Sequence, residues 1–312
     1  MAAIPQPEYT PPSSVEMSSR QNEASALGLL IAQRRLYSRA KRWLGLRWFG
    51  MLMIGLAAPV ISVVWPHLAV VSGAVAGLWL FLGQTVLVYA QSAMTARAAA
   101  IQEQFDFYVF GMPSSIERST LPPMEEISAL TGPNEDLDAV ASEQKLIDWY
   151  PISADNTGIT TVAISQRANA VYTDRLLRTT AIVWVATTVA WVLVLVGISI
   201  SVGLSLLTFL VGVLLPVLPA FLDILRYIVG VWRAAHDRRD LARSIERRLK
   251  SVDQGIEGRD LLVWQDRLYD LRYSTPLIPD SIYKIRRVVN ERAMESAASQ
   301  LSKMAKKSDR SH

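Results

Sequence analysis

The sequence predicts an all-α membrane protein with four transmembrane helices in two hairpins and a mostly helical cytoplasmic region. The 312 residues are 51% hydrophobic and only 19% charged. A soluble domain carries about 25% charged residues. The charges are also unevenly placed, because residues 49–96 and residues 179–222 contain no Asp, Glu, Lys or Arg. A membrane-spanning helix needs about 20 mostly apolar residues, so each charge-free block has room for two spans.

A break near the middle of each block divides it into a helical hairpin. The first break is Trp65, Pro66 and His67, and the second is the Gly- and Ser-containing segment 197–203. We therefore expect spans at about 49–65, 68–90, 180–198 and 203–229. Any single apolar run is also consistent with a buried core helix, but two charge-free blocks of this length argue against that alternative.

The charges beside the spans predict the orientation. Lys and Arg gather at residues 34–47, before the first span, and at residues 233–250, after the fourth, whereas the two hairpin breaks carry none. Cytoplasmic loops are enriched in Lys and Arg. We therefore expect a multi-pass protein of the bacterial inner (cell) membrane with both termini and the central segment in the cytoplasm.

Composition and charge divide the chain into seven segments. They are a disordered N-terminus (1–23), a basic amphipathic helix (24–47), transmembrane hairpin 1 (48–96), an acidic cytoplasmic insert (97–178), transmembrane hairpin 2 (179–230), a cytoplasmic helical tail (231–303) and a frayed C-terminus (304–312). The basic helix is suited either to an anionic membrane surface or to packing on the cytoplasmic region, and both interpretations stay open.

The insert and the tail are expected to pack on one another. The insert has 12 acidic and 6 basic residues, whereas the parts on either side of it are net positive. Helices are expected at about 97–110 and 161–178 in the insert. The tail is expected to form three helices, at about 231–252, at about 259–273 and after Pro279. An apolar stripe in the second of these indicates core packing and consists of Leu261, Trp264, Leu268 and Leu271.

Several short blocks outside the spans carry a resemblance to a known family. They are Ala32–Lys41, Ile101–Asp106 with Val109–Pro113, Asp148–Pro151, and Ser165–Asn169. In this order around two helical hairpins, they resemble the SMODS-associating four-transmembrane effector family. This family is found beside cyclic-oligonucleotide signalling genes of bacterial anti-phage defence. The resemblance implies a pore-forming effector that dissipates ion gradients across the membrane, with a cyclic oligonucleotide or a signalling partner protein as its trigger.

The fourth span carries a stripe of small and polar residues at helical spacing. It consists of Ser201, Ser205, Thr208, Gly212, Pro216, Pro219, Asp223, Arg226 and Gly230. Such a stripe allows close helix packing, and around an oligomer axis it also lines a water-filled path. Pro216 and Pro219 remove backbone donors and are hinge candidates. Asp223 and Arg226 form either an interfacial pair or a charged pore mouth.

The second span repeats this pattern more weakly. Gly73 and Gly77 form a GxxxG sequence, which marks close helix packing or a pore lining. Gln84 is the best candidate for a polar side chain inside the bilayer core, where it needs a partner from another helix, another subunit or water.

Two further groups of candidates lie outside the spans. Arginines suited to phosphate groups, lipid headgroups or the acidic insert are Arg243, Arg247, Arg248, Arg286 and Arg287. The turn that offers large apolar anchors for docking within the cytoplasmic region consists of Asp148, Trp149, Tyr150 and Pro151.

The same sequence excludes several other classes of function. It has no cysteine, and its three histidines are far apart, so we expect no metal site. No nucleotide-binding or hydrolase motif is present, so we expect neither an enzyme nor a cofactor. The net charge of +4 gives no indication of DNA or RNA binding. Because four spans leave little room for a channel, we expect a homo-oligomer in the lipid bilayer. A membrane-anchored scaffold or sensor without a pore is the leading alternative, and a regulated solute transporter is the third.

Overall fold

The computed structural model describes residues 8–113, 118–133, 136–251 and 255–309. Within these ranges the chain forms helices and no strand. Four helical segments are long and apolar enough to cross a membrane: Ala24–Val64, Pro66–Phe110, Gly158–Ser201 and Leu206–Lys250. The predicted all-α fold with four transmembrane helices is confirmed.

The helices follow one another with few interruptions. The α-helices are α1 (Ser14–Arg20), α2 (Ala24–Val64), α3 (Ala69–Leu82), α4 (Val88–Phe110), α5 (Met124–Thr131), α6 (Leu137–Glu143), α7 (Gly158–Ser201), α8 (Leu206–Thr208), α9 (Leu215–Lys250), α10 (Gly258–Ser274) and α11 (Asp280–Asp309). A 3₁₀ turn, η1 (Pro66–Leu68), joins α2 to α3. Two π-helical stretches, η2 (Gly83–Leu87) and η4 (Phe209–Leu214), lie before α4 and α9.

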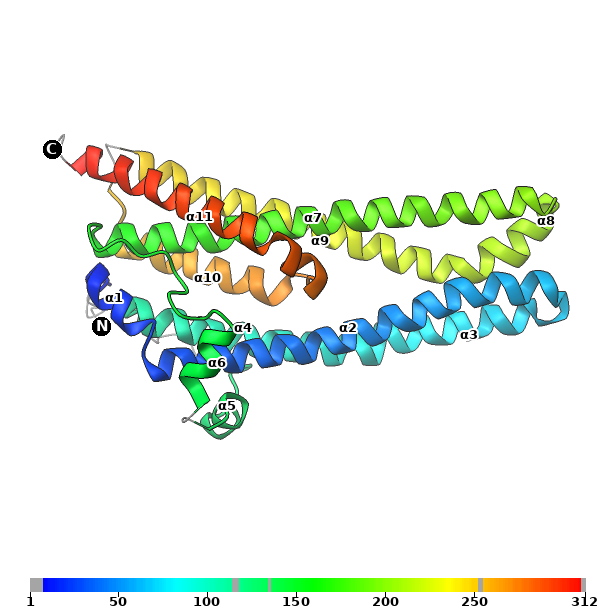
Figure 1. Ribbon diagram of the computed structural model, residues 1–312, viewed down its shortest axis with the longest axis horizontal. Helices are drawn as coiled ribbons and strands as arrows, with labels where there is room; N and C mark the ends of the chain where they lie inside the picture. The colour runs from blue at the N-terminus through cyan, green and yellow to red at the C-terminus, as the bar shows by residue number, and fades with distance from the viewer. Residues whose placement is uncertain (1–7, 114–117, 134–135, 252–254, 310–312) are drawn as a thin grey trace, which may run out of the picture.

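Figure 1 shows the two hairpins as the elongated half of the molecule, with both turns at one end and both chain termini at the other. Pro66 begins the first turn. Gly203 permits the second through its positive φ of 71°. Helix α7 continues to Ser201, so the second turn begins only at the end of the segment 197–203 that was expected to contain it.

The polar ends of the long helices form one helical body together with α1, α5, α6, α10 and α11. We call this body, which comprises the described residues of 8–46, 92–178 and 232–309, the extramembrane domain. Each span enters the domain without a helix break, since α2, α7 and α9 contain 41, 44 and 36 residues. Each of these three helices therefore belongs both to the domain and to a span.

The N-terminal segment differs from the expected disorder. Ser13 caps α1, because its side chain accepts a hydrogen bond from the backbone N–H of Glu16 at 3.2 Å. Met17 of this helix is 0% exposed and belongs to the main core of the domain. The prediction of disorder was based on the polar composition of this segment. Composition does not reveal a short helix that is held by one buried apolar side chain, here Met17. Residues 1–7 lie outside the described residues.

The basic segment 24–47 forms the first half of α2 and packs on the domain. Its apolar side chains are buried, among them Leu30, Ile31 and Leu36. Arg34 donates to the backbone oxygen of Gln144, and Arg35 donates to that of Leu130 at 2.8 Å. Of the two interpretations left open for this segment, packing on the domain is the one that these contacts show.

Ion pairs link the acidic insert to the basic tail. Arg272 Nη1 lies 2.6 Å from Asp106 Oδ2, and Arg167 Nη2 lies 2.8 Å from Glu246 Oε2. The predicted apolar stripe of α10 is buried in the same core, which confirms its packing role. The insert also contains α5 and α6, two short helices that the periodicity does not predict.

Candidate functional site

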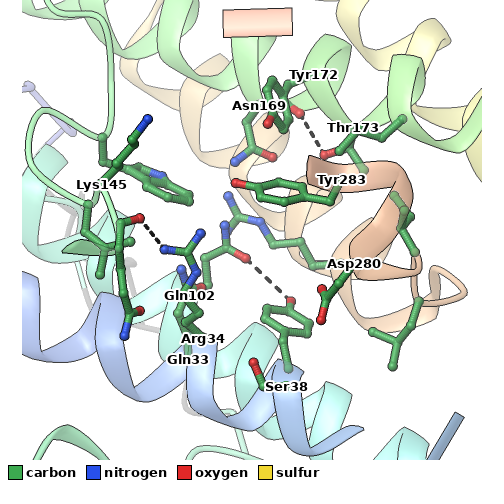
Figure 2. A pocket seen from close by; sticks show the side chains of 18 of the residues that line it. Gln33, Arg34, Ser38, Gln102, Lys145, Asn169, Tyr172, Thr173, Asp280 and Tyr283 are labelled. Atoms are coloured by element: carbon green, nitrogen blue, oxygen red, sulfur yellow. Dashed lines mark hydrogen bonds between the residues drawn. The ribbon is translucent and has the colours of Figure 1, made fainter. Parts of the chain in front are cut away.

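A large, partly open cavity lies in the extramembrane domain. Its volume is about 920 Å³, which is near the upper end of the range for small-molecule sites. Figure 2 shows side chains converging on it from α2, α4, α7, α11 and the loop after α6. Helices α2, α4 and α7 each continue into a span, and the loop after α6 leads into α7. The cavity wall is therefore built largely from elements that are joined to the spans.

Arg238 of α9 lines this cavity and is only 2% exposed. Its Nη2 donates to the backbone oxygen of Leu271 at 2.9 Å and contacts Thr275 Oγ1 at 3.1 Å. Its Nε and Nη1 have no partner among the protein atoms described. Burial, together with the neighbouring Arg272, lowers the pKa of Arg238 to about 10. Arg238 is therefore charged at neutral pH and incompletely paired.

Arg272 of α10 lies beside Arg238 but has a counter-charge. Asp106 of α4, which is fully buried, accepts hydrogen bonds from Arg272 at 2.6 Å, from Tyr150 Oη at 2.6 Å and from Gln265 at 2.7 Å. Burial acts to lower the pKa of Arg272, but Asp106, Tyr150 and Tyr37 together outweigh it and raise that pKa. The network joins α4 to α10 and holds the wall of the cavity in place.

Amide and aromatic side chains complete the lining. Gln33 is 4% exposed, and its Oε1 has no protein partner. Gln102 Oε1 contacts Tyr37 Oη at 3.5 Å, a contact drawn in Figure 2. The rings of Tyr172 and Tyr283 meet edge to face, 6.4 Å apart. Among the described residues, no group of three His, Asp or Glu side chains is placed to hold a metal ion.

The predicted docking turn forms one edge of the cavity. Tyr150 is buried, and its backbone N–H donates to Gln21 Oε1 at 2.9 Å, at the end of α1. Asp148 has a positive φ of 53° and accepts a hydrogen bond from Asn22 at 2.9 Å. Trp149 and Pro151 line the cavity beside them.

Those predicted phosphate-binding arginines whose side chains the structure describes do not line the cavity. Arg243 and Arg247 are exposed on α9, and Arg248 pairs with Asp260 at 2.9 Å. The side chains of Arg286 and Arg287 lie outside the described residues. A signal for Arg238 is present in the sequence. It falls on the apolar face of the tail helix between Ala234 and Leu241, where an arginine is out of place.

A second polar site lies where the spans meet the domain. Arg47 of α2 is 7% exposed and binds Asp223 of α9, which is 1% exposed. Its Nε lies 3.0 Å from Asp223 Oδ2, and its Nη2 lies 2.7 Å from Oδ1. Gln84 of η2 also donates to Asp223. We call Arg47, Asp223 and Gln84 the interhairpin cluster, because it joins both hairpins.

The interhairpin cluster corrects one expected pairing. Asp223 has Arg47 as its partner and not Arg226, which is exposed and forms no ion pair among the described residues. Beside the cluster, the rings of Trp48, Trp184 and Tyr227 pack together, with centroids 4.4–5.7 Å apart. The four spans are therefore tied together at one level, the second through Gln84 and the others through the charge pair and the aromatic group.

The stripe predicted on the fourth span is not one continuous helical face. Ser201 belongs to the end of α7, and Ser205 caps the short α8 by accepting from the Thr208 N–H. The π-helical η4 then changes the register. From Gly212 to Asp223 the face packs on the first hairpin, since Gly212 lies against Ser62, Pro216 is buried and Asp223 binds Arg47.

The other span candidates have different surroundings. Pro219 lies inside α9, and the bend of the fourth span between α8 and α9 is visible in Figure 1. Gly73 and Gly77 face open space on α3, because a Cβ added at either would meet no atom within 4 Å. Among the described residues of one chain, no other helix packs closely against these two glycines. Gly230, the last residue of the stripe, lies against Pro276.

A comparison with family models matches the SMODS-associating 4TM effector domain over residues 16–301. No curated protein and no solved structure matches the chain. The matched residues include all four spans, the interhairpin cluster and every part of the cavity wall. The chain thus belongs to the family of SMODS-associating four-transmembrane effectors.

Proposed function

We propose that the chain is a pore-forming effector of bacterial anti-phage defence. It oligomerises in the inner membrane with both termini in the cytoplasm. A nucleotide second messenger or a signalling partner protein triggers it from the cytoplasmic side. Opening lets ions cross and dissipates their gradients. The family match supports an effector that is associated with a SMODS signalling partner.

The observation that carries this proposal is the interhairpin cluster. A buried charge on a membrane-spanning helix is costly and often marks an ion path or a gate. Here the charges of Arg47 and Asp223 neutralise each other between two otherwise apolar hairpins, and the Gln84 amide completes their hydrogen bonds. We interpret this arrangement as the closed state. When the hairpins separate, the hydrogen bonds among these three polar side chains break. Water then enters between the hairpins and replaces the lost bonds.

The exposed faces of the spans support assembly of several copies. In its most apolar part, α7 buries only 11% of its residues within the chain, and the corresponding part of Pro66–Phe110 buries 22%. These faces contact lipid or neighbouring copies. A single chain of four spans cannot surround a wide path, so the proposed pore is built by an oligomer.

A membrane-anchored scaffold or sensor without a pore is the second candidate. It is favoured by the satisfied state of the interhairpin cluster, which needs no water or second chain to complete it. Ion flux separates the two candidates, since a scaffold shows none under any condition.

The test is ion flux from liposomes that contain the purified full chain, with and without cyclic oligonucleotides or the SMODS partner. Gln84→Leu should reduce triggered flux several-fold while the protein still assembles. Thr85→Leu is the matched control, because Thr85 is exposed and bonds only to the Phe81 carbonyl of its own helix. Absence of flux from correctly oriented wild type with every trigger rejects the pore and leaves the scaffold.

A further inference from the structure

The cavity of the extramembrane domain carries an excess of positive charge. Among the described residues that line it, six are Lys or Arg and three are Asp or Glu. Lys41 is paired with Asp280, and Arg272 with Asp106. Arg238 forms no ion pair with any described carboxylate, although it is almost completely buried. Asp174 favours the charge of Arg238 but pairs with Arg178 and Arg239, so the described residues neutralise this buried cation only in part.

The hydrogen-bonding state of Arg238 also indicates a missing partner. Two of its three guanidinium nitrogens have donors with no protein acceptor, whereas the third is fixed to the end of α10. A buried charged donor without an acceptor destabilises the folded state. Phosphate oxygens are the acceptors that a guanidinium matches best, both in charge and in geometry. The third nitrogen fixes the position of the group, and a phosphate reaches the two buried nitrogens when the side chains that cover them move.

The rest of the lining suits the other half of a nucleotide. Trp149, Tyr172 and Tyr283 present aromatic rings, on which nucleobases stack. The buried Gln33 amide keeps an acceptor oxygen without a partner, and amides of this kind bind the edges of bases. A site for inorganic phosphate alone needs neither feature.

We propose that the cavity is a nucleotide-binding site, with a phosphate of the ligand bound to Arg238 and a base bound between the aromatic rings and Gln33. The inference rests on the proposed function only in naming this ligand as the trigger of the effector. Phosphodiester headgroups of anionic lipids share the same phosphate chemistry, and the experiment below separates the two sources.

The position of Arg238 connects the site to the spans. Arg238 and Asp223 lie on the same uninterrupted helix, α9, fifteen residues apart, which is about 22 Å at 1.5 Å per residue. A ligand that moves Arg238 relative to α10 therefore moves the helix that carries Asp223. This is the route by which occupancy of the cavity weakens the interhairpin cluster.

Binding is tested by thermal unfolding of the full chain in phosphatidylcholine nanodiscs. The probes are cyclic di-AMP, cyclic di-GMP, cyclic tri-AMP and pyrophosphate, each at constant ionic strength. At least one nucleotide should raise the unfolding temperature of the wild type. Arg238→Met and Arg238→Lys should each weaken that binding by about tenfold or more, the size expected for the loss of charged hydrogen bonds. Arg238→Lys guards against misfolding, since it keeps the charge and loses only the planar donors.

Arg243→Met is the matched control. It makes the same chemical change on the same helix, but Arg243 is exposed and lies outside the cavity. Each probe should raise the unfolding temperature of the Arg243→Met variant by as much as it raises that of the wild type. Equal weakening by Arg243→Met and Arg238→Met means a non-specific charge effect and overturns the proposal.

The remaining outcomes are also decisive. If none of the probes stabilises the wild type more than Arg238→Met, the cavity is not a nucleotide site. If phosphatidylglycerol in the nanodiscs produces the Arg238-dependent stabilisation and the nucleotides do not, the site binds headgroups and the nucleotide assignment is wrong. Nucleotide binding without ion flux keeps this inference and rejects the pore. Triggered ion flux without Arg238-dependent nucleotide binding keeps the pore and rejects the nucleotide site.

Discussion

The carboxyl group of Glu103 is an example of a buried acid whose environment opposes its charge. Burial raises the pKa of Glu103 above its ordinary value of 4.5, although Arg118 donates two hydrogen bonds to it. The folded state therefore holds the proton more tightly than the unfolded chain does. The resulting stability is complete below pH 4.5 and is lost as the pH rises through the folded pKa.

Glu103→Gln should therefore flatten this part of the pH dependence. Relative to the variant, the wild type should lose stability as the pH rises above 4.5, because the variant has no proton to release. The measurement is the denaturant midpoint of both proteins in detergent across this range. A midpoint difference that does not change with pH would contradict the prediction.

Glu246 provides a control of opposite sign. Hydrogen bonds from Lys250 and then from Arg167 lower the pKa of Glu246. Its contribution is present above pH 4.5 and is lost as the pH falls through the folded pKa. Glu246→Gln should thus change the profile on the acid side of 4.5, and Glu103→Gln on the other side.

At this scale the sequence identifies which side chains are unusual better than it identifies their partners. Gln84 and Asp223 stand out because they interrupt apolar runs, and both belong to the interhairpin cluster. Arg47 does not stand out, since it is one of many basic residues before the first span. Its partner lies 176 residues away, and only the tertiary fold brings the two together.

Helices were predictable where apolar periodicity is long and breakers are clear. The four spans and the three tail helices follow from such patterns, and Pro66 and Gly203 mark the turns. Helix α1 and the π-helical stretch η4 were not predicted, because each depends on a few tertiary contacts. For η4, the extra residue per turn changes which side chains face α2, so a stripe counted at regular spacing loses its register.

The coupling of α2 to α9 gives a prediction at the scale of elements. Asp223→Asn removes the negative charge between the two helices and leaves Arg47 buried without a counter-ion. Loss of one partner from a buried ion pair costs about 3–5 kcal/mol. We expect a lower unfolding temperature and, because the hairpins separate more easily, increased ion flux without a trigger.

Arg226→Gln is the companion variant for this measurement. It changes a charge one helical turn from Asp223, but its side chain is exposed and has no ion-pair partner among the described residues. Its stability should stay within about 0.5 kcal/mol of the wild type, and its resting flux should not rise. If both variants behave alike, the effect belongs to net charge near the membrane and not to the interhairpin cluster.

The whole molecule combines a polar domain with an internal cavity and a membrane part with few internal contacts. The two are joined by long helices and not by flexible linkers, so ligand binding and hairpin packing are parts of one equilibrium. Occupancy of the cavity needs to favour the open arrangement by only a few kcal/mol to shift most of the population. Assembly with other copies of the chain also contributes to this equilibrium. It depends on the surfaces of the spans that a single chain leaves exposed.

Gly73 and Gly77 give the test of assembly. Both residues face open space on α3, since a Cβ at either would meet no neighbouring described atom within 4 Å, so leucine there should leave the unfolding temperature of the monomer nearly unchanged. In an oligomer, the same side chains would prevent the close approach that a GxxxG sequence permits. We expect Gly73→Leu with Gly77→Leu to reduce the oligomer fraction in native mass spectrometry and to abolish triggered flux. Gly45→Leu adds an equal side chain in equally open space, on α2 outside the charge-free blocks, and should preserve both. An intact oligomer in the double variant would move the subunit interface from α3 to the exposed face of α7.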